Sequence, residues 1–259
     1  MMEASSLTVL VLAGSRHGAT DPMAVAAHVS HKALLPVGGT PMLLRVIRAL
    51  RATPAVGRIV VSSERTDLLD GFPESAEILS IRAEPSPSRS VAAALETFGA
   101  PLLVTTADHA LLSPAILADF LSRAPQSADA VAAVARSDVI RAGFPGTQRT
   151  WIRLRDGDFS GCNLFLLRRE KALRAVAFWR RIEERRKSPL AMAWLIGPAA
   201  LIGYALRILT LDGVARLLSR RTGAALAVTA LSHADAAIDV DKPADLELVE
   251  RTLAARAAA

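Results

Sequence analysis

Two patterns of hydrophobic residues alternate along the first half of the chain. Short, uninterrupted apolar runs have the length of buried strands, and segments between them carry apolar residues at helical spacing with Pro or Ser near the start. The strand-like runs are 7–13, 58–63, 101–108 and 129–135. The helical segments are 41–52, 88–98 and 113–124. This alternation predicts an α/β fold with three layers: a mostly parallel sheet with helices on both faces.

The second half is less regular. An Asp-Gly turn within 150–170 predicts a hairpin, and helices are expected over 170–187 and 190–221. Late strands and a terminal helix are expected at 224–231, 236–241 and 242–259. Because no repeat or low-complexity linker divides the chain, we expect one domain over 1–259, with an inserted helical and hairpin lobe at about 140–225.

The composition limits the classes of function. The formal net charge is +6, but the basic residues are scattered, so no nucleic-acid partner is expected. The densest basic run, 168–187, also contains acids and predicts a solvated helix face. Cys162 is the single cysteine, which excludes an internal disulfide and suits a reducing compartment. Since residues 1–6 lack the pattern of a signal peptide, we expect a cytoplasmic protein.

Residues 190–206 carry no charge and are interrupted by Gly197 and Pro198. This length is at the lower limit for crossing a bilayer. The segment predicts a buried helix pair or a homodimer contact. The alternatives are a peripheral membrane contact and, less in keeping with the interruption, a membrane span.

Polar residues follow three of the predicted strands where each one ends. Gly14, Ser15 and Arg16 follow the first, a Ser pair at 62–63 ends the second, and Asp108 ends the third. In open parallel sheets, ligands bind beyond the carboxyl ends of the strands. The Gly14 loop matches neither the dinucleotide nor the P-loop pattern. Two interpretations remain for this loop. It is either an ordinary turn, or a loop whose amides, together with Arg16 and Lys32, hold nucleotide phosphates.

Carboxylates supply the candidate metal ligands. Asp108 is placed to bind Mg²⁺, although a turn or helix-capping role is the alternative. Asp239 and Asp241 alternate along a predicted strand, so they share one face and repel each other unless a metal or Lys242 intervenes. Asp245 is expected to be an acid in the first turn of the terminal helix.

Two further groups could contact an anionic substrate. Asn163 lies near Gly161 in a predicted strand, where glycine often marks the close approach of a ligand or another backbone. Arg149 is one of several arginines available to an anionic acceptor, although a surface role is the alternative. No Ser nucleophile motif is present, Cys162 has no obvious basic partner, and the histidines lack zinc-type spacing.

Three motifs together resemble the MobA-like nucleotidyltransferases. They are "VLAGSR" followed by "HKALLPVGGTPMLLRVI", then "LLVTTADHALLS", and "IDVDKPADL" near the C-terminus. The resemblance implies a GT-A-like, Rossmann-type fold and transfer of a nucleotidyl group from an NTP, CTP or GTP being favoured, with release of pyrophosphate.

The resemblance also implies residue roles. Lys32 and Arg16 would stabilise the charge of the reacting phosphates, and Asp108 and Asp241 would hold Mg²⁺ with Asp239 nearby. The NTP-binding residues would be Ala13, Gly14, Ser15, Ser88 and Ser90. The acceptor, an anionic phosphorylated small molecule, would contact Asn163, with Arg149 available to it.

The chain also departs from the family pattern. Ser15 replaces a second glycine, and the long run before Lys32 indicates additional structure such as a short helix. The insertion favours a sugar, polyol or alcohol phosphate acceptor. The alternatives are a molybdenum-cofactor guanylyl- or cytidylyltransferase, a GT-A glycosyltransferase and a non-catalytic nucleotide-binding module.

Overall fold

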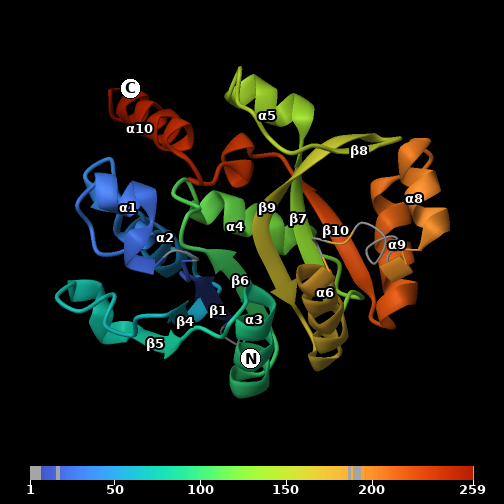
Figure 1. Ribbon diagram of the computed structural model, residues 1–259, viewed down its shortest axis with the longest axis horizontal. Coiled ribbons are helices and arrows are strands. Elements are labelled where there is room, and N and C mark those ends of the chain that lie inside the picture. Colours follow the sequence, from blue (N-terminus) through green and yellow to red (C-terminus); the bar gives the residue numbers. More distant parts are fainter. Residues whose placement is uncertain (1–6, 16–17, 186–187, 189–193, 196, 259) are drawn as a thin grey trace.

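The computed structural model describes residues 7–15, 18–185, 188, 194–195 and 197–258. A twisted sheet crosses the centre of the molecule and helices cover both of its faces (Figure 1). The strands are β1 (Leu7–Leu12), β2 (Pro36–Val37), β3 (Thr40–Pro41), β4 (Val56–Ser63), β5 (Ile78–Arg82), β6 (Leu102–Thr106), β7 (Ala130–Arg136), β8 (Ile152–Leu154), β9 (Gly157–Leu167) and β10 (Leu226–Leu231). The α-helices are α1 (Pro22–Ala26), α2 (Met42–Arg51), α3 (Pro87–Phe98), α4 (Pro114–Arg123), α5 (Ser137–Gly143), α6 (Leu173–Arg185), α8 (Pro198–Ala205), α9 (Leu211–Thr222) and α10 (Pro243–Ala257).

The main sheet has the order β10-β7-β9-β6-β1-β4-β5, and β8 pairs with β9. Neighbours in this order are parallel except at β9, which runs antiparallel to β6, β7 and β8. The mostly parallel α/β sheet predicted from the sequence is therefore confirmed.

Both faces of the central strands are buried, which explains their continuous apolar runs. Val9 and Val11 of β1 point into the cluster that contains α2 and α4. Leu10, between them, belongs to the opposite cluster, which includes Val91 of α3 and Val176 of α6. Alternate residues of one strand thus serve two layers, as the period of a strand requires.

Capping and turn residues place the helices as the sequence predicts. Asp21 accepts hydrogen bonds from the amides of Met23 and Ala24, which begins α1, the short helix expected before Lys32. Ser113 caps α4 with Pro114 at the first helical position. Helix α3 begins one residue earlier than predicted, at Pro87, with Ser86 as its cap.

The strand predicted over 236–241 is wrong. A short 3-10 helix, η5 (Ala234–Ala237), is followed by extended chain outside the sheet. In this extended chain, the Val240 amide donates a hydrogen bond to the Asp108 carbonyl oxygen at 3.0 Å, as a paired strand would. The alternating residues therefore line a loop against the end of β6.

The range 140–225, expected to form an inserted lobe, does not lie apart from the sheet. It contains β9, which pairs with both β6 and β7 near the middle of the sheet. Helix α6, from the same range, packs on α3. Helices α8 and α9 lie together at one side of the molecule (Figure 1). In the part of the chain that the structure describes, no helix combines the length and the apolar character needed to cross a bilayer.

Candidate active site

The carboxyl ends of β1, β4 and β6 meet at one edge of the sheet. The register pairs Leu12 with Ser62 on one side and with Thr106 on the other. Beyond the strands, the Ala13 amide donates to the Ser62 carbonyl at 2.8 Å, and the Ala107 amide donates to the Leu12 carbonyl at 2.9 Å. The loops that carry Gly14 and Asp108 are thus held next to each other, as predicted.

Asp108 is partly buried at this edge and accepts a hydrogen bond from the Thr106 hydroxyl. Burial raises its pKa to about 6, and the nearby carboxylates of Asp239 and Asp241 contribute to the increase. The Thr106 hydrogen bond and the charge of Lys32 oppose this shift. A carboxylate that is desolvated among other carboxylates attracts a cation strongly.

Lys32 provides the first cation of the site. It begins the 3-10 helix η2 (Lys32–Leu34), and its ammonium donates to Asp241 Oδ1 at 3.1 Å. Its side chain is 19 % exposed, so it stays accessible to solvent. The following β2-β3 hairpin turns at Gly38 and Gly39, both with positive φ, so glycine is required there.

Arg149 provides the second cation. Its guanidinium contacts Asp239 Oδ1, and its side chain is 10 % exposed. The Asn163 amide donates to the other oxygen, Asp239 Oδ2, at 3.1 Å. Sequence reasoning offered Lys242 or a metal to relieve the repulsion between Asp239 and Asp241. The structure instead pairs the two carboxylates with Arg149 and Lys32.

Asn163 reaches Asp239 because β9 is irregular at this point. Its φ of +48° lies in the left-handed region, and the β7-β9 register shifts between Ala132 and Val134. Such bulges redirect a side chain away from the regular alternation. The neighbouring Gly161 has no atom within 4 Å of an added Cβ, so the close approach of another backbone, one of two explanations for this glycine, is wrong.

The Gly14 loop already holds an anionic group. The Ser15 amide donates to the Glu64 carboxylate, at 3.1 Å to Oε2. His31 Nε2 lies 2.9 Å from Glu64 Oε1, and its Nδ1 accepts from the Ala33 amide. That backbone donor requires an unprotonated Nδ1, so His31 is neutral and its Nε2–H donates to Glu64.

Glu64 and His31 were missed by the sequence reasoning. The rule that found Asp108 would also have found Glu64, because it follows the Ser pair at the carboxyl end of β4. Ala13 is buried and Gly14 is exposed beside this group. Arg16, predicted to neutralise phosphate, lies outside the described residues.

Ser88 and Ser90 lie at the start of α3, and both are buried. The Ser88 hydroxyl donates to Glu183 of α6, while Ser90 Oγ accepts from the Glu84 amide at 2.9 Å. These contacts fix the loop before α3. A role of the two serines toward the NTP stays a prediction.

The predicted place of Asp245 in the first turn of the terminal helix is confirmed. Asp245 accepts from the amides of Asp241 and Lys242 at 3.2 Å and so begins α10. Cys162 is buried, and burial raises the pKa of its thiol, which rules out a reactive thiolate.

The donor set suits a magnesium ion that is shared with a substrate. Within the described residues, no three His, Cys, Asp or Glu side chains enclose a metal position. Protein sites for Mg²⁺ often consist of one or two carboxylates, with phosphate oxygens completing the shell. Asp108 and Asp241 provide two such carboxylates next to the loop edge.

Comparisons with known proteins agree with this geometry. The model of the MobA-like NTP transferase domain matches residues 9–226. A hypothetical transferase structure from Thermus thermophilus is similar at 30 % identity and a TM-score of 0.82, with 93 % of this chain and 99 % of that chain covered. No curated protein matches the chain.

Two more distant structures share the fold. A CMP:2-keto-3-deoxy-manno-octonic acid synthetase complexed with CTP has a TM-score of 0.56 at 13 % identity, with 97 % of this chain and 100 % of that chain covered. A 4-diphosphocytidyl-2C-methyl-D-erythritol synthase from Anaerococcus prevotii has a TM-score of 0.57 at 10 % identity, with 97 % of both chains covered. The Rossmann-like fold is confirmed, and the chain belongs to the MobA-like NTP transferase domain family and is a nucleotidyltransferase.

Proposed function

We propose that the protein transfers NMP from an NTP to a phosphorylated small molecule, with Mg²⁺ as cofactor. An acceptor phosphate oxygen forms the new bond to the α-phosphorus, and the bond from that phosphorus to the β-phosphate bridge breaks to release pyrophosphate. The observation that carries the proposal is that two carboxylates of one extended segment each form an ion pair. Lys32 meets Asp241 on the loop side, and Arg149 meets Asp239 beside Asn163.

The NTP side is formed by the Gly14 loop and Lys32. The Ser15 amide donates to the carboxylate of Glu64, so it is directed toward an anion. Phosphate oxygens accept from such amides in the same way. The positive charge of Lys32 stabilises the negative charge of the reacting phosphates. This stabilisation is largest in a partly desolvated site. Ala13, Gly14 and Arg16 complete this part of the proposal.

Asp108 and Asp241 would hold the metal. Mg²⁺ bound there would neutralise phosphate charge and orient the NTP. Both oxygens of Asp239 already accept hydrogen bonds, from Arg149 and Asn163. We therefore assign Asp239 mainly to positioning these two side chains, a narrower role than that of a third ligand.

The acceptor side is formed by Arg149 and Asn163. The Arg149 guanidinium is fixed by Asp239, so a phosphate can meet it with little loss of side-chain entropy. No atom lies within 4 Å of a Cβ added at Gly161, so the space beside this glycine is open. We propose a sugar, polyol or alcohol phosphate as the acceptor. A molybdenum-cofactor precursor is the alternative.

We propose CTP or GTP as the nucleotide, with Ser88 and Ser90 fixing the loop near the base. One of the two distant structures is described as a complex with CTP, which favours testing CTP first. The buried hydrogen bonds of the two serines favour an indirect contribution, through the Glu84 backbone and Glu183.

A screen of four NTPs against sugar, polyol, alcohol and pterin phosphates, with pyrophosphate release as the readout, tests the proposal. Activity should require Mg²⁺ and should be lost in Asp108→Asn. Consumption of a nucleotide sugar without pyrophosphate would instead indicate a glycosyltransferase. Tight NTP binding without turnover on any acceptor would indicate a non-catalytic module.

A further inference from the structure

Exposed hydrophobic side chains concentrate around α8. Among the described residues, the large exposed hydrophobic side chains are Val25, Leu79, Ile152, Trp194, Ile202, Tyr204, Leu206 and Ile208. Five of these eight lie within 194–208, and Trp194 and Leu206 are 72 % and 64 % exposed. We call the side chains of Trp194, Ile202, Tyr204, Leu206 and Ile208 the α8 face. Scattered exposed apolar residues are ordinary, but a concentration of this kind marks an interaction surface.

Helix α8 lacks the polar side that a surface helix normally has. Its sequence, PAALIGYA, contains no charged residue, although Ile202 and Tyr204 face solvent. The Tyr204 hydroxyl lies 3.4 Å from the Arg153 amide, which joins α8 to β8. Ile152 of β8, the residue before Arg153, is also exposed. A helix that is apolar on all sides is unfavourable in water unless something covers it.

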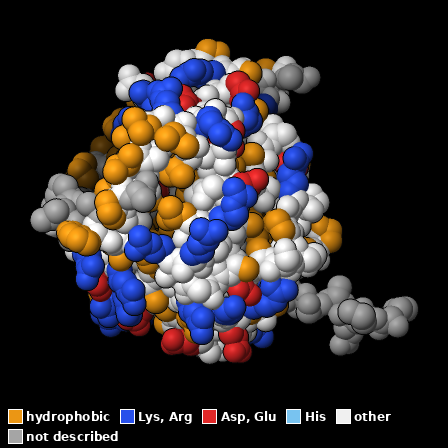
Figure 2. All heavy atoms as spheres, turned by 90° about the vertical axis from the view of Figure 1, so that its right-hand side faces the viewer, with side chains coloured by type: hydrophobic (Ala, Val, Ile, Leu, Met, Phe, Trp, Pro, Cys, Tyr) orange, Lys and Arg blue, Asp and Glu red, His pale blue; other side chains and the backbone are white. Residues whose placement is uncertain are grey.

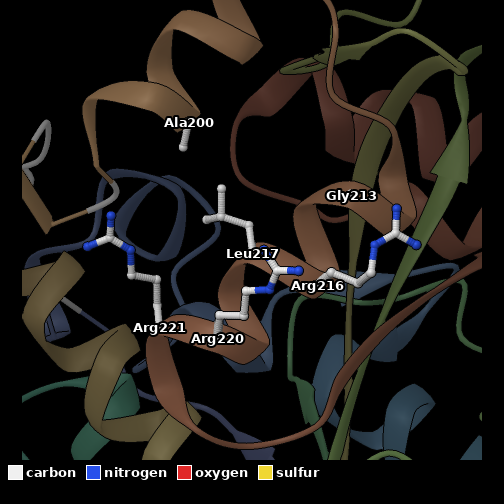
Figure 3. Close-up of a pocket in the computed structure, with 6 residues that line it drawn as sticks. All are labelled: Ala200, Gly213, Arg216, Leu217, Arg220 and Arg221. Carbon is white, nitrogen blue, oxygen red and sulfur yellow. The ribbon is translucent and has the colours of Figure 1, made fainter.

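Arginines border the α8 face. A pocket of about 290 Å³ between α8 and α9 is lined by Ala200, Gly213, Arg216, Leu217, Arg220 and Arg221. Figure 3 shows Leu217 pointing toward Ala200 and the three arginine side chains spread along α9. Gly197 has no side chain, and Arg221 lies against its backbone: an added Cβ would be 2.0 Å from Nη2.

Basic residues outnumber acidic residues around α8 and α9, although the Asp156 carboxylate accepts from the Leu211 amide at the start of α9. Between Ser188 and Gly223 the sequence contains Arg207, Arg216, Arg220 and Arg221, with Asp212 as the one acid. Figure 2 shows hydrophobic side chains gathered on this side of the molecule with basic side chains beside them. A surface that combines apolar and basic groups suits a partner that has an apolar interior and an anionic surface.

We infer that the α8 face docks on the surface of an anionic lipid bilayer. The apolar side chains enter the boundary between headgroups and acyl chains, where Trp194 and Tyr204 are especially favourable. Arg216, Arg220 and Arg221 contact phosphate headgroups. The contact is peripheral, in keeping with the shortness of α8.

The same charges argue against a second copy of the chain as the occupant. A two-fold symmetric dimer applies the same surface patch to itself. It would bring Arg216, Arg220 and Arg221 of both copies to one interface, where the acids at the start of α9, Asp212 and Asp156, are fewer than the arginines. An anionic bilayer relieves this repulsion, whereas self-association increases it.

Co-sedimentation of the full chain with vesicles tests the inference. Vesicles of phosphatidylcholine with about one third phosphatidylglycerol should bind the protein, vesicles of phosphatidylcholine alone should bind it far more weakly, and salt should weaken the binding. Ile202→Asp should abolish it. The double variant Arg216→Gln with Arg220→Gln should weaken it by about 10- to 30-fold. Lipids brominated on the acyl chain should quench the fluorescence of the parent protein more than that of Trp194→Phe.

Matched controls separate docking from general effects of substitution. Leu79→Asp places the same change at an exposed hydrophobic residue on β5, and Arg251→Gln removes an exposed arginine from α10, so both should bind as the parent does. Equal binding to neutral and anionic vesicles, or none to either, would overturn the inference. So would a dimer in sedimentation that Ile202→Asp dissociates, since a second copy would then cover the face.

Discussion

Lys32 Nζ donates to Asp241 Oδ1 at 3.1 Å, although 209 positions separate the two residues in the sequence. The pair connects the first βα connection with the segment that leads into α10. It sets one cation directly beside the carboxylates proposed to hold Mg²⁺.

Removing this cation should slow catalysis more than it weakens binding. Lys32→Ala is expected to lower kcat by about 10²- to 10³-fold and to change the NTP KM much less, because charge on the reacting phosphates loses its partner. Pyrophosphate release measures the effect, and Lys171→Ala provides an exposed lysine as control. A rise in the NTP KM with kcat unchanged would contradict this role, because Lys32 would then act in substrate binding and not in the reaction step.

Ionisation of Asp108 should cost stability. Burial raises its pKa from the usual 3.8 to about 6, so the folded state holds this proton more tightly than the unfolded chain. The cost is absent below about pH 4, grows up to about pH 6 and is complete above it. Asp108→Asn should therefore stabilise the metal-free protein at pH 8 by about 1–3 kcal/mol and leave it unchanged near pH 4.

Urea unfolding in the presence of a chelator, at both pH values, measures this difference. Glu247→Gln, an exposed carboxylate on α10, should show no such pH dependence. A gain of the same size near pH 4 would mean that packing, and not charge, explains the stabilisation.

Glu64 should oppose the binding of a triphosphate. Its carboxylate accepts hydrogen bonds from the Ser15 amide and from the neutral His31. Neither of these contacts brings a positive charge that would offset the charge of the carboxylate. Glu64→Gln removes the charge and keeps an acceptor for Ser15, and we expect NTP to bind about two- to tenfold more tightly. Titration calorimetry with a non-hydrolysable NTP measures the dissociation constant. Glu74→Gln is not a suitable control, because Glu74 pairs with Arg48. Weaker binding would show that Glu64 mainly supports the loop.

Arg149 should act on the acceptor and leave the nucleotide largely unaffected. Arg149→Ala is expected to raise the acceptor KM by about 10- to 100-fold, while the NTP KM stays within about twofold. Arg149→Lys should recover little, since lysine lacks the planar fork that meets Asp239. Arg153→Ala, on β8 four residues away, is the matched control. Equal increases in both KM values would contradict a role on the acceptor side.

Periodicity was sufficient for the buried elements and failed at the margins. Strands β1, β4, β6 and β7 have continuous apolar runs because both faces are covered. Strand β5 was missed because it is at the sheet edge and none of its residues is fully buried, so its sequence shows neither a continuous apolar run nor a regular alternation. The acidic alternation near 239 imitated a strand, but its backbone pairs with the Asp108 carbonyl outside the sheet.

The part of the site that lies at the carboxyl ends of strands could be predicted from the sequence. The rule that ligands bind beyond these ends leads to Gly14, Asp108 and, with one further step, Glu64. The pairing of Arg149 with Asp239 could not be predicted, because it joins the chain before β8 to the chain after η5, positions 90 apart in the sequence. Only the closed fold brings two such loops together.

The central place of β9 has a consequence for synthesis of the chain on the ribosome. Strand β7 follows β6 in the sequence, yet β9 lies between them in the sheet, so the edges of β6 and β7 that face β9 stay unpaired until residue 167 has emerged. A nascent chain that stops earlier presents two unpaired apolar edges, which invites association with other chains. Strand β9 also carries Asn163. The strand that joins the two parts of the sheet therefore also carries a residue of the acceptor side, so the site cannot form before the sheet is joined.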